Sequence, residues 1–256
     1  MRKMINLNAD IAEGWGAYDI GNDAELMKII KSASVACGFH AGDANTMHRL
    51  CVLAKAEGVS VGAHPGFNDL WGFGRRRIQM RPSDLEYMIA YQIGALQAMA
   101  AYAGLKVTHL KAHGALNNMA AEDEEYAMAI GRAIKAVDRN IIYVALSGSQ
   151  METAARALSL PLASEGFPDR RYDDAGNLAS RSIPGSVIKD PQAAAEQALR
   201  MAQGEVVSLA GKRVKVRTDT LCVHGDEATG VAVARAIRAG LEGAGIAVVP
   251  LTDMQL

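Results

Sequence analysis

Four of the six histidines in this 256-residue chain end short runs of small and apolar residues. The runs VACGFH, VSVGAH, VTHLKAH and LCVH end at His40, His64, His113 and His224, and Gly or Pro follows each within two residues. A carboxylate has the same position near the start, where INLNAD ends at Asp10. Polar groups at successive strand ends are how a (β/α) barrel or a doubly wound sheet builds an active site. The pattern therefore predicts an enzyme.

Length and composition favour a single domain over residues 1–256. Barrels of about 250 residues form one core, and 50% hydrophobic with 5% aromatic residues is typical of a tightly packed enzyme. A net charge of -1 gives no attraction for nucleic acid or an anionic membrane. No signal segment and no apolar run of about 18 residues is found, so a cytoplasmic protein without a membrane span is expected. Three cysteines without metal-like spacing are expected to be buried thiols: Cys37, Cys51 and Cys222.

Strand-like and helix-like stretches alternate along the chain. Strands are expected near residues 4–10, 33–38, 59–64, 107–113, 141–147, 161–166, 220–224 and 246–250. Amphipathic helices are expected at 23–31, 44–57, 82–103, 122–136, 191–203 and 227–244, with Asp23, Ser83 and Asp226 as N-caps. This order predicts an α/β fold, a (β/α) barrel of seven to eight parallel strands. Residues 65–81 and 166–190 lack periodicity and are expected to be functional loops.

The period-two pattern puts polar side chains on one face of each strand. Asn6, Asn8 and Asp10 share a face, and so do His109, Lys111 and His113. The outward face of a barrel strand meets helices and must be apolar, so these polar faces are expected to point inward. Buried polar groups need partners such as one another, a metal or a ligand. A buried polar network without chemistry is the alternative to an active site.

Seven motifs resemble one family in the same order along nearly the whole chain. They are NADIAEG (8–14), ACGFHAGD (36–43), GAHPGFNDLWGFGRR (62–76), LKAHGALNN (110–118), EGFPDRRY (165–172), SRSIPGSVI (180–188) and CVHGD (222–226). Through these motifs the chain resembles the LamB/YcsF family. This resemblance implies a barrel related to the polysaccharide deacetylase architecture. It also implies a part in a 5-oxoprolinase, which opens the lactam of 5-oxoproline to glutamate with ATP and with partner subunits B and C.

The chain departs from the family pattern at a few uncharged positions. It reads KAHGALNN where the family usually has KPHGALYN, EGFPDR where EVFADR is usual, and Ser180 where a proline precedes Arg181. These departures bear on substrate fit more than on reaction type.

A five-membered lactam is a poor electrophile with a poor leaving group. Its hydrolysis near pH 7 needs an activated water, a stabilised oxyanion and a protonated nitrogen. Candidate catalytic groups are Asp10, Glu13, His40, His64, Lys111 and His113. Candidate groups for binding the substrate and its anionic parts are Arg75, Arg76, Glu165, Arg170, Arg181 and His224. Lactam chemistry driven by ATP does not require a metal, so no metal ligands are assigned.

Two other functions remain open from the sequence. An Asp with several His at strand ends also suits a metal-dependent deacetylase or amidase. A non-catalytic subunit that presents 5-oxoproline to its partners is the other alternative. The chain has no G-x-x-x-x-G-K-[ST] run. ATP is therefore expected to act at the level of the complex, without a P-loop in this chain.

Overall fold

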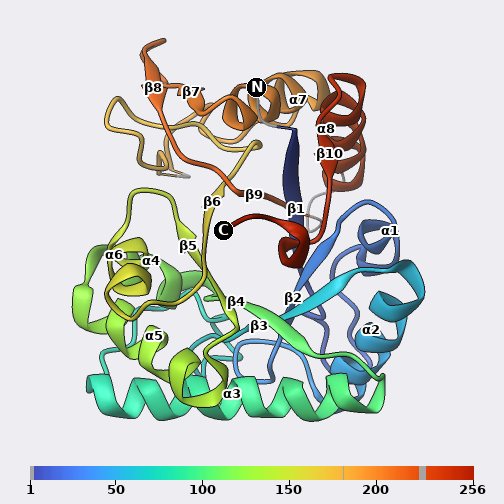
Figure 1. The fold of residues 1–256 in the computed structure, drawn as a ribbon, viewed down its shortest axis with the longest axis vertical. Coiled ribbons are helices and arrows are strands. Elements are labelled where there is room, and N and C mark those ends of the chain that lie inside the picture. Colours follow the sequence, from blue (N-terminus) through green and yellow to red (C-terminus); the bar gives the residue numbers. More distant parts are fainter. Residues whose placement is uncertain (1–2, 181, 225–228) are drawn as a thin grey trace.

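Seven parallel strands close a barrel at the centre of this computed structural model, which describes residues 3–180, 182–224 and 229–256 (Figure 1). The strands are β1 (Met4–Ile11), β2 (Ser32–Ala36), β3 (Ser60–His64), β4 (Val107–Lys111), β5 (Ile142–Leu146), β6 (Leu162–Gly166) and β9 (Thr220–Val223). Strand β9 pairs with both β6 and β1, which closes the ring. The predicted α/β barrel is confirmed.

Helices surround the strands, with α3 along one side of the molecule and α7 beside α8 at the opposite end (Figure 1). They are α1 (Asp23–Met27), α2 (Ala44–Glu57), α3 (Pro82–Tyr102), α4 (Gly114–Glu122), α5 (Glu124–Asp138), α6 (Gln150–Ala157), α7 (Pro191–Ala202) and α8 (Gly230–Gly243). A 3₁₀ turn, η1 (Leu251–Asp253), follows near the C-terminus. In the described part of the chain, no helix combines the length and apolar character needed to cross a bilayer.

Several sequence predictions need correction in detail. The predicted strand at 246–250 is short: β10 (Ala247–Val248) pairs with the first residues of β1 and lies outside the closed ring. Helices α4 and α6 and the antiparallel hairpin β7 (Glu205–Val207) and β8 (Arg213–Lys215) were not predicted. Each of these four elements is at most nine residues long, too short for a clear period in the sequence.

Two of the predicted helix caps are wrong. Asp23 is the first residue of α1, and its carboxylate accepts the backbone N–H of Ala12 instead. Ser83 follows Pro82, and the proline begins α3 because its missing N–H is not needed there. Asp226 lies outside the described residues.

The polar strand faces point into the barrel, as the period-two pattern predicted. The Asn8 amide donates to Glu165 and to Thr220, which belong to β6 and β9. The Asn6 amide donates to Ser32 of β2. Below the mouth the interior is thus filled by hydrogen-bonded side chains in place of the usual branched apolar layers.

Gly62 makes room for one of these buried side chains. A Cβ at Gly62 would lie 2.2 Å from the His109 ring, so the inward face of β3 must be bare here. Burial lowers the pKa of His109 to about 3, so this imidazole is neutral and structural. The three cysteines are buried free thiols, as expected.

Candidate active site

The carboxyl ends of the strands surround one cavity of about 320 Å³. Asp10 of β1, His64 of β3, Lys111 of β4 and His224 after β9 all line it. Side chains from the loops and from α4 complete the wall, among them Glu13, Phe73, Arg75, His113, Asn117, Phe167 and Arg170. Residues that lie far apart in the sequence therefore meet at the barrel mouth.

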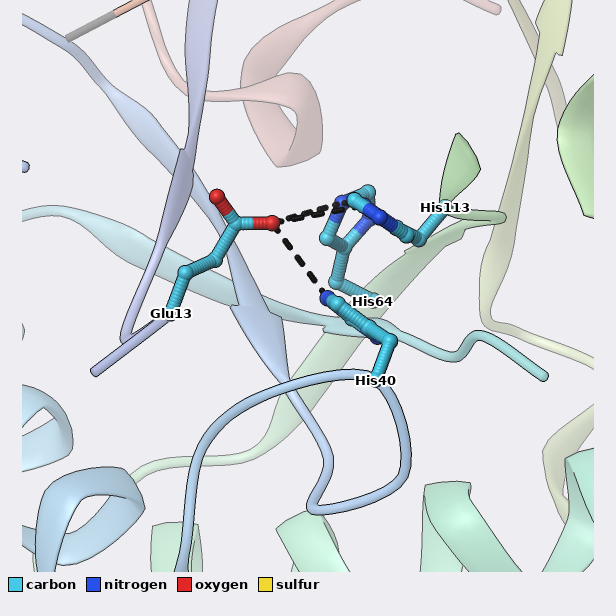
Figure 2. Close-up of side chains that lie close together, drawn as sticks. All are labelled: Glu13, His40, His64 and His113. Carbon is cyan, nitrogen blue, oxygen red and sulfur yellow. Dashed lines mark hydrogen bonds and ion pairs between the residues drawn. The ribbon is translucent and has the colours of Figure 1, made fainter. Parts of the chain in front are cut away.

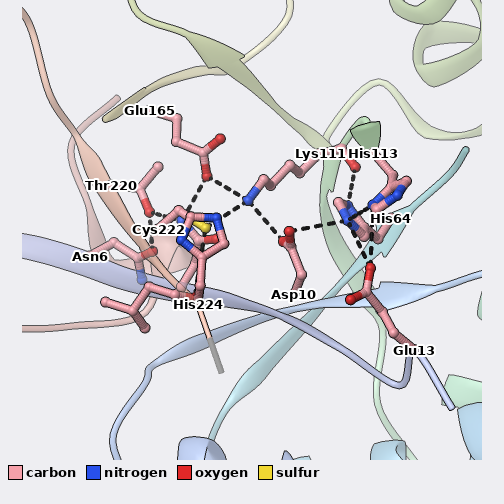
Figure 3. A network of polar contacts seen from close by, with 12 residues as sticks. Asn6, Asp10, Glu13, His64, Lys111, His113, Glu165, Thr220, Cys222 and His224 are labelled. Atoms are coloured by element: carbon pink, nitrogen blue, oxygen red, sulfur yellow. Dashed lines mark hydrogen bonds and ion pairs between the residues drawn. The ribbon is translucent and has the colours of Figure 1, made fainter. Parts of the chain in front are cut away.

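Lys111 forms the centre of one side of this mouth (Figure 3). Its Nζ lies 2.8 Å from Asp10 Oδ1, 3.1 Å from Glu165 Oε1 and 2.9 Å from Cys222 Sγ. Burial opposes the charge of Lys111, but Asp10, Cys222 and Glu165 outweigh burial and hold the pKa of the ammonium well above its ordinary value. We call Asp10, Lys111, Glu165 and Cys222 the lysine side of the mouth.

The pKa values of the two carboxyl groups on the lysine side are shifted in opposite directions. Burial alone would raise the pKa of Asp10, but His64 and Lys111 hold it well below its ordinary value. Burial raises the pKa of Glu165, and Lys111 only partly offsets this. The Asp10 carboxylate is therefore the main counter-charge of the buried ammonium.

Three imidazoles and one carboxylate form the other side of the mouth, shown in Figure 2. Glu13 Oε1 lies 3.3 Å from both His40 Nε2 and His113 Nδ1, and 3.9 Å from His64 Nε2. His64 Nε2 and His113 Nδ1 are 3.0 Å apart. We call Glu13, His40, His64 and His113 the histidine side. One donor atom from each of these four residues lies within 4.8 Å of the others, a grouping that could hold a metal ion.

Backbone carbonyls fix the orientation of two of these rings. His64 Nδ1 is 2.8 Å from the carbonyl oxygen of Lys111, and His113 Nε2 is 2.8 Å from that of Phe73. A carbonyl oxygen only accepts hydrogen bonds, so each of these two nitrogens carries a proton. The other nitrogen of each ring, His64 Nε2 or His113 Nδ1, faces the cluster.

The charges on the histidine side follow from burial and from these contacts. Burial raises the pKa of Glu13, but hydrogen bonds from His113 and His40 outweigh it and lower the value to about 2. Burial lowers the pKa of His40 to about 3. Burial also disfavours charge on His64, but Asp10 outweighs it and raises the pKa of that imidazole. At neutral pH Glu13 is ionised and His40 is a neutral donor to it.

Two segments with left-handed backbone hold the histidine side in place. Ala12, with φ of 63°, turns the chain after β1 so that Glu13 lies against the rings. Gly74 brings the loop after β3 onto the cluster, since a Cβ there would lie 2.7 Å from His40 and 2.8 Å from His113. The predicted functional loop at 65–81 thus forms part of the site.

His224 lies across the cavity from these rings and is paired with Asp169. Its Nδ1 donates to Asp169 Oδ2, and its ring stacks on Phe167 with centroids 5.8 Å apart. Burial disfavours charge on His224, but Asp169 outweighs it and raises the pKa of the imidazole. The loop after β6 therefore holds an imidazole that keeps a proton more readily than free histidine.

The residues predicted to bind substrate fall into three groups. Arg75 and Arg170 line the cavity, and Arg170 Nη2 also donates to the carbonyl of Ala179 at 2.6 Å. Arg76 is not among the lining residues, because its guanidinium pairs with Asp69 in the loop. Arg181 lies outside the described residues.

Glu165 also needs a different assignment from the predicted one. It is 1% exposed, does not line the cavity, and binds Lys111 and Asn8. A carboxylate in this position anchors the lysine and does not contact an anion.

Sequence reasoning missed several lining residues. Phe73 supplies the carbonyl that orients His113, and Phe167 supports His224. The signal for Phe73 was its position between Gly72 and Gly74 in an unpatterned loop. The sequence does not separate a functional Asp169 from an ordinary turn residue, and only the fold shows its contact with His224.

A second cavity of about 520 Å³ opens beside Glu13 and His40 and has an apolar rim. Its rim includes Trp15, Tyr18, Ile20, Leu70 and Trp71. Trp71 is 97% exposed. These side chains belong to the loops after β1 and β3, which also shape the main site.

Comparisons with known proteins identify the family to which this chain is similar. The model of the LamB/YcsF family matches residues 5–256. A protein of Rhodopseudomonas palustris, named as the A subunit of 5-oxoprolinase, is 54% identical over 248 residues, which cover 96% of this chain and 98% of the relative. The crystal structure of a lactam utilization protein from Thermus thermophilus is 46% identical, with a TM-score of 0.93 over 97% of this chain and all of the other.

A more distant structure shares the fold alone. The catalytic domain of a peptidoglycan N-acetylglucosamine deacetylase from Eubacterium rectale has a TM-score of 0.51 at 12% identity, over 99% of this chain and 90% of the other. The expected likeness to the deacetylase architecture is thus confirmed at the level of the fold.

Proposed function

Because this chain belongs to the LamB/YcsF family, we propose that it is the A subunit of an ATP-hydrolysing 5-oxoprolinase. In a complex with subunits B and C it would hydrolyse the lactam of 5-oxoproline to L-glutamate. The relatives are named as one subunit of an enzyme, which implies a complex of several subunits. The observation that carries the proposal is the polar cavity lined by Lys111, by Glu13, His64 and His113 of the histidine side, and by His224, which Asp169 holds. The cytoplasmic location expected from the sequence stays a prediction.

Each chemical requirement of lactam opening has a candidate group in this cavity. Glu13 is an ionised carboxylate in contact with two imidazoles, so it can orient an attacking water whose proton passes to the histidine side. Lys111 offers a fixed positive charge to the oxygen of the carbonyl as it becomes an oxyanion. His224, held by Asp169, offers a proton to the lactam nitrogen as it leaves.

Opening the lactam requires water, protons and an activating group from ATP, and each bond that forms is matched by one that breaks. The water oxygen bonds to the lactam carbonyl carbon, the ring C–N bond breaks, and the nitrogen takes up protons to become the ammonium group of glutamate. A phosphoryl group transferred from ATP to the lactam oxygen would supply the activation and leave as phosphate, and a second water molecule would supply the oxygen that the phosphate carries away. We assign nucleotide binding to the partner subunits because this chain has no P-loop sequence. Arg75 and Arg170 are the candidate partners of the substrate carboxylate.

Reconstitution with purified B and C subunits tests the proposal. The complex should release glutamate and ADP together, whereas this chain alone should release no glutamate with or without ATP. Asp10→Asn and His113→Ala should each abolish glutamate formation while circular dichroism shows a folded chain. His48→Ala is the matched control, because His48 is exposed on α2 and should leave the rate unchanged.

The same experiment decides between the alternatives. Full activity of the Asp10→Asn and His113→Ala complexes would mean that this chain only presents the substrate. Substantial glutamate release by the single chain without ATP would mean that it is a self-sufficient amidase.

A metal-dependent deacetylase or amidase is the second candidate function. The grouping of Glu13, His40, His64 and His113 is the observation that favours it. Loss of ATP-independent amide hydrolysis on treatment with a chelator would support this second function over the first.

A further inference from the structure

The histidine side and Asp10 bring nitrogen and oxygen atoms that can bind a proton or a cation together at short range. One nitrogen of each ring, His64 Nδ1 and His113 Nε2, donates its proton to a carbonyl oxygen, so the second nitrogens, His64 Nε2 and His113 Nδ1, face each other across 3.0 Å. Glu13 Oε1 lies 3.3 Å from His113 Nδ1, and Asp10 Oδ2 lies 3.4 Å from His64 Nε2. The Lys111 ammonium binds Asp10 through the other oxygen, Oδ1. Such an arrangement is favourable only when a proton or a cation lies among these atoms.

Four of the six distances among the donor atoms of Asp10, Glu13, His64 and His113 are close to those of a metal site. Zinc binds imidazole nitrogen and carboxylate oxygen at about 2.0–2.2 Å, so donors at the corners of a tetrahedron lie roughly 3.3 Å apart. The distances from His64 Nε2 to His113 Nδ1, Asp10 Oδ2 and Glu13 Oε1 are 3.0, 3.4 and 3.9 Å, and Glu13 Oε1 to His113 Nδ1 is 3.3 Å. Small side-chain shifts would equalise them.

Outer contacts of the kind found around metal ligands are already present. The ring N–H groups of His64 and His113 are held by main-chain carbonyls, which fixes the tautomer that a metal ligand needs. Asp10 is held by Lys111, and Glu13 by His40.

His40 is better placed beside this site than in it. Its ring stacks on that of His113, with centroids 3.7 Å apart and planes 5° from parallel. A metal lies near the plane of each imidazole that binds it, and two parallel stacked rings have no common in-plane point. His40 therefore orients Glu13 through its Nε2.

We propose that His64 Nε2, His113 Nδ1, Glu13 and Asp10 bind one divalent cation of the zinc class at the barrel mouth. Two imidazoles with two carboxylates favour zinc, cobalt, nickel or iron over magnesium and calcium, which prefer oxygen donors alone. A cation here would add Lewis-acid polarisation to the cavity. This inference departs from the expectation that no metal is required, and it does not rest on the proposed function, since binding is measured without substrate or partners.

The full-length chain is stripped of metal with a chelator and then titrated with zinc in competition with a chromophoric indicator. The wild-type chain should take up one zinc ion with a dissociation constant of about 1 μM or tighter. His64→Ala and His113→Ala should each weaken binding at least about 100-fold, and His40→Asn, which changes an outer contact, roughly tenfold. His48→Ala, an exposed histidine on α2, is the control and should bind as wild type.

Cobalt(II) as the probe reports the ligands themselves. The wild-type complex should give an intense tetrahedral visible spectrum. Its proton spectrum should show two hyperfine-shifted exchangeable signals, from the His64 Nδ1–H and the His113 Nε2–H. Glu13→Gln keeps the shape of the side chain and should weaken binding even if the alanine variants fold poorly. Zinc binding that is equally tight in the His64→Ala/His113→Ala double variant, or a cobalt spectrum of the hydrated ion, would overturn the proposal.

Discussion

The two sides of the barrel mouth both consist of buried or half-buried ionisable side chains but differ in how their charges are balanced (Figure 3). On the lysine side an ammonium lies between carboxyl groups, so the buried charges neutralise each other within the chain. On the histidine side the ionised Glu13 and one ring nitrogen each of His64 and His113 face one another at short range. The lysine side is complete as folded, whereas the histidine side is built to receive a proton or a cation. Changes on the lysine side are therefore expected to affect stability as well as chemistry, and changes on the histidine side to affect chemistry with little loss of stability.

The largest effect is expected from removing Lys111. Lys111→Met would leave Asp10 and Glu165 buried without their cation, which should lower the free energy of unfolding by about 3–5 kcal/mol. Urea denaturation measures this loss. The Lys111→Met/Glu165→Gln double variant should regain part of it, because one buried charge is then removed. A loss below about 1 kcal/mol would show that the two sides do not differ in this way.

A change on the histidine side should show the reverse pattern. His113→Gln removes an imidazole of the site with its contacts to Phe73, His64 and Glu13, and the glutamine amide can replace part of them, so unfolding should become easier by only about 1–2 kcal/mol. Glutamate formation by the reconstituted complex should fall about 10²–10⁴-fold. Denaturation curves and steady-state rates on the same preparation separate the two effects. A variant that is strongly destabilised but fully active would contradict the comparison.

Asp23 accepts a hydrogen bond from the turn that positions Glu13, and its ionisation should make the free energy of unfolding depend on pH. Burial raises its pKa to about 6, above the ordinary value of 3.8, so the folded state binds this proton more tightly than the unfolded chain. The contribution of Asp23 is greatest at low pH and is lost as the pH rises from about 4 through 6. Asp23→Asn should remove this dependence and gain on the order of 1–2 kcal/mol at pH 7. Unfolding measured at pH 5 and pH 7 in both proteins checks it; equal slopes would refute the assignment.

The smallest effect separates two neighbouring arginines. Arg75 lines the cavity, whereas Arg76 pairs with Asp69 in the loop. Arg75→Ala should raise KM for 5-oxoproline about tenfold, near 1.4 kcal/mol, with kcat little changed. Arg76→Ala should leave KM unchanged. The opposite result would restore the predicted anion-binding role of Arg76.

The sequence was sufficient for the barrel and for the strand-end residues, because both depend on local patterns. Period-two alternation placed Asn8 and Lys111 on inward faces, and the sequence placed His64, His113 and His224 at or just after the ends of β3, β4 and β9. The pairings that give the site its chemistry depend on contacts distant in sequence. Glu165 binds Lys111 across the barrel, and the stacking of His40 on His113 comes from loops after different strands. Charge alone could not tell Arg75 from Arg76, since only the fold of the loop brings Asp69 to one of them.

The central claim is that one lactam binds between the lysine side and the histidine side. A crystal structure of the chain soaked with 5-oxoproline tests it most directly. The account predicts difference density in the 320 Å³ cavity, with the lactam carbonyl oxygen directed at Lys111 and the carboxylate toward Arg75 or Arg170. Density for 5-oxoproline outside this cavity, with Lys111 and His113 untouched, would contradict it.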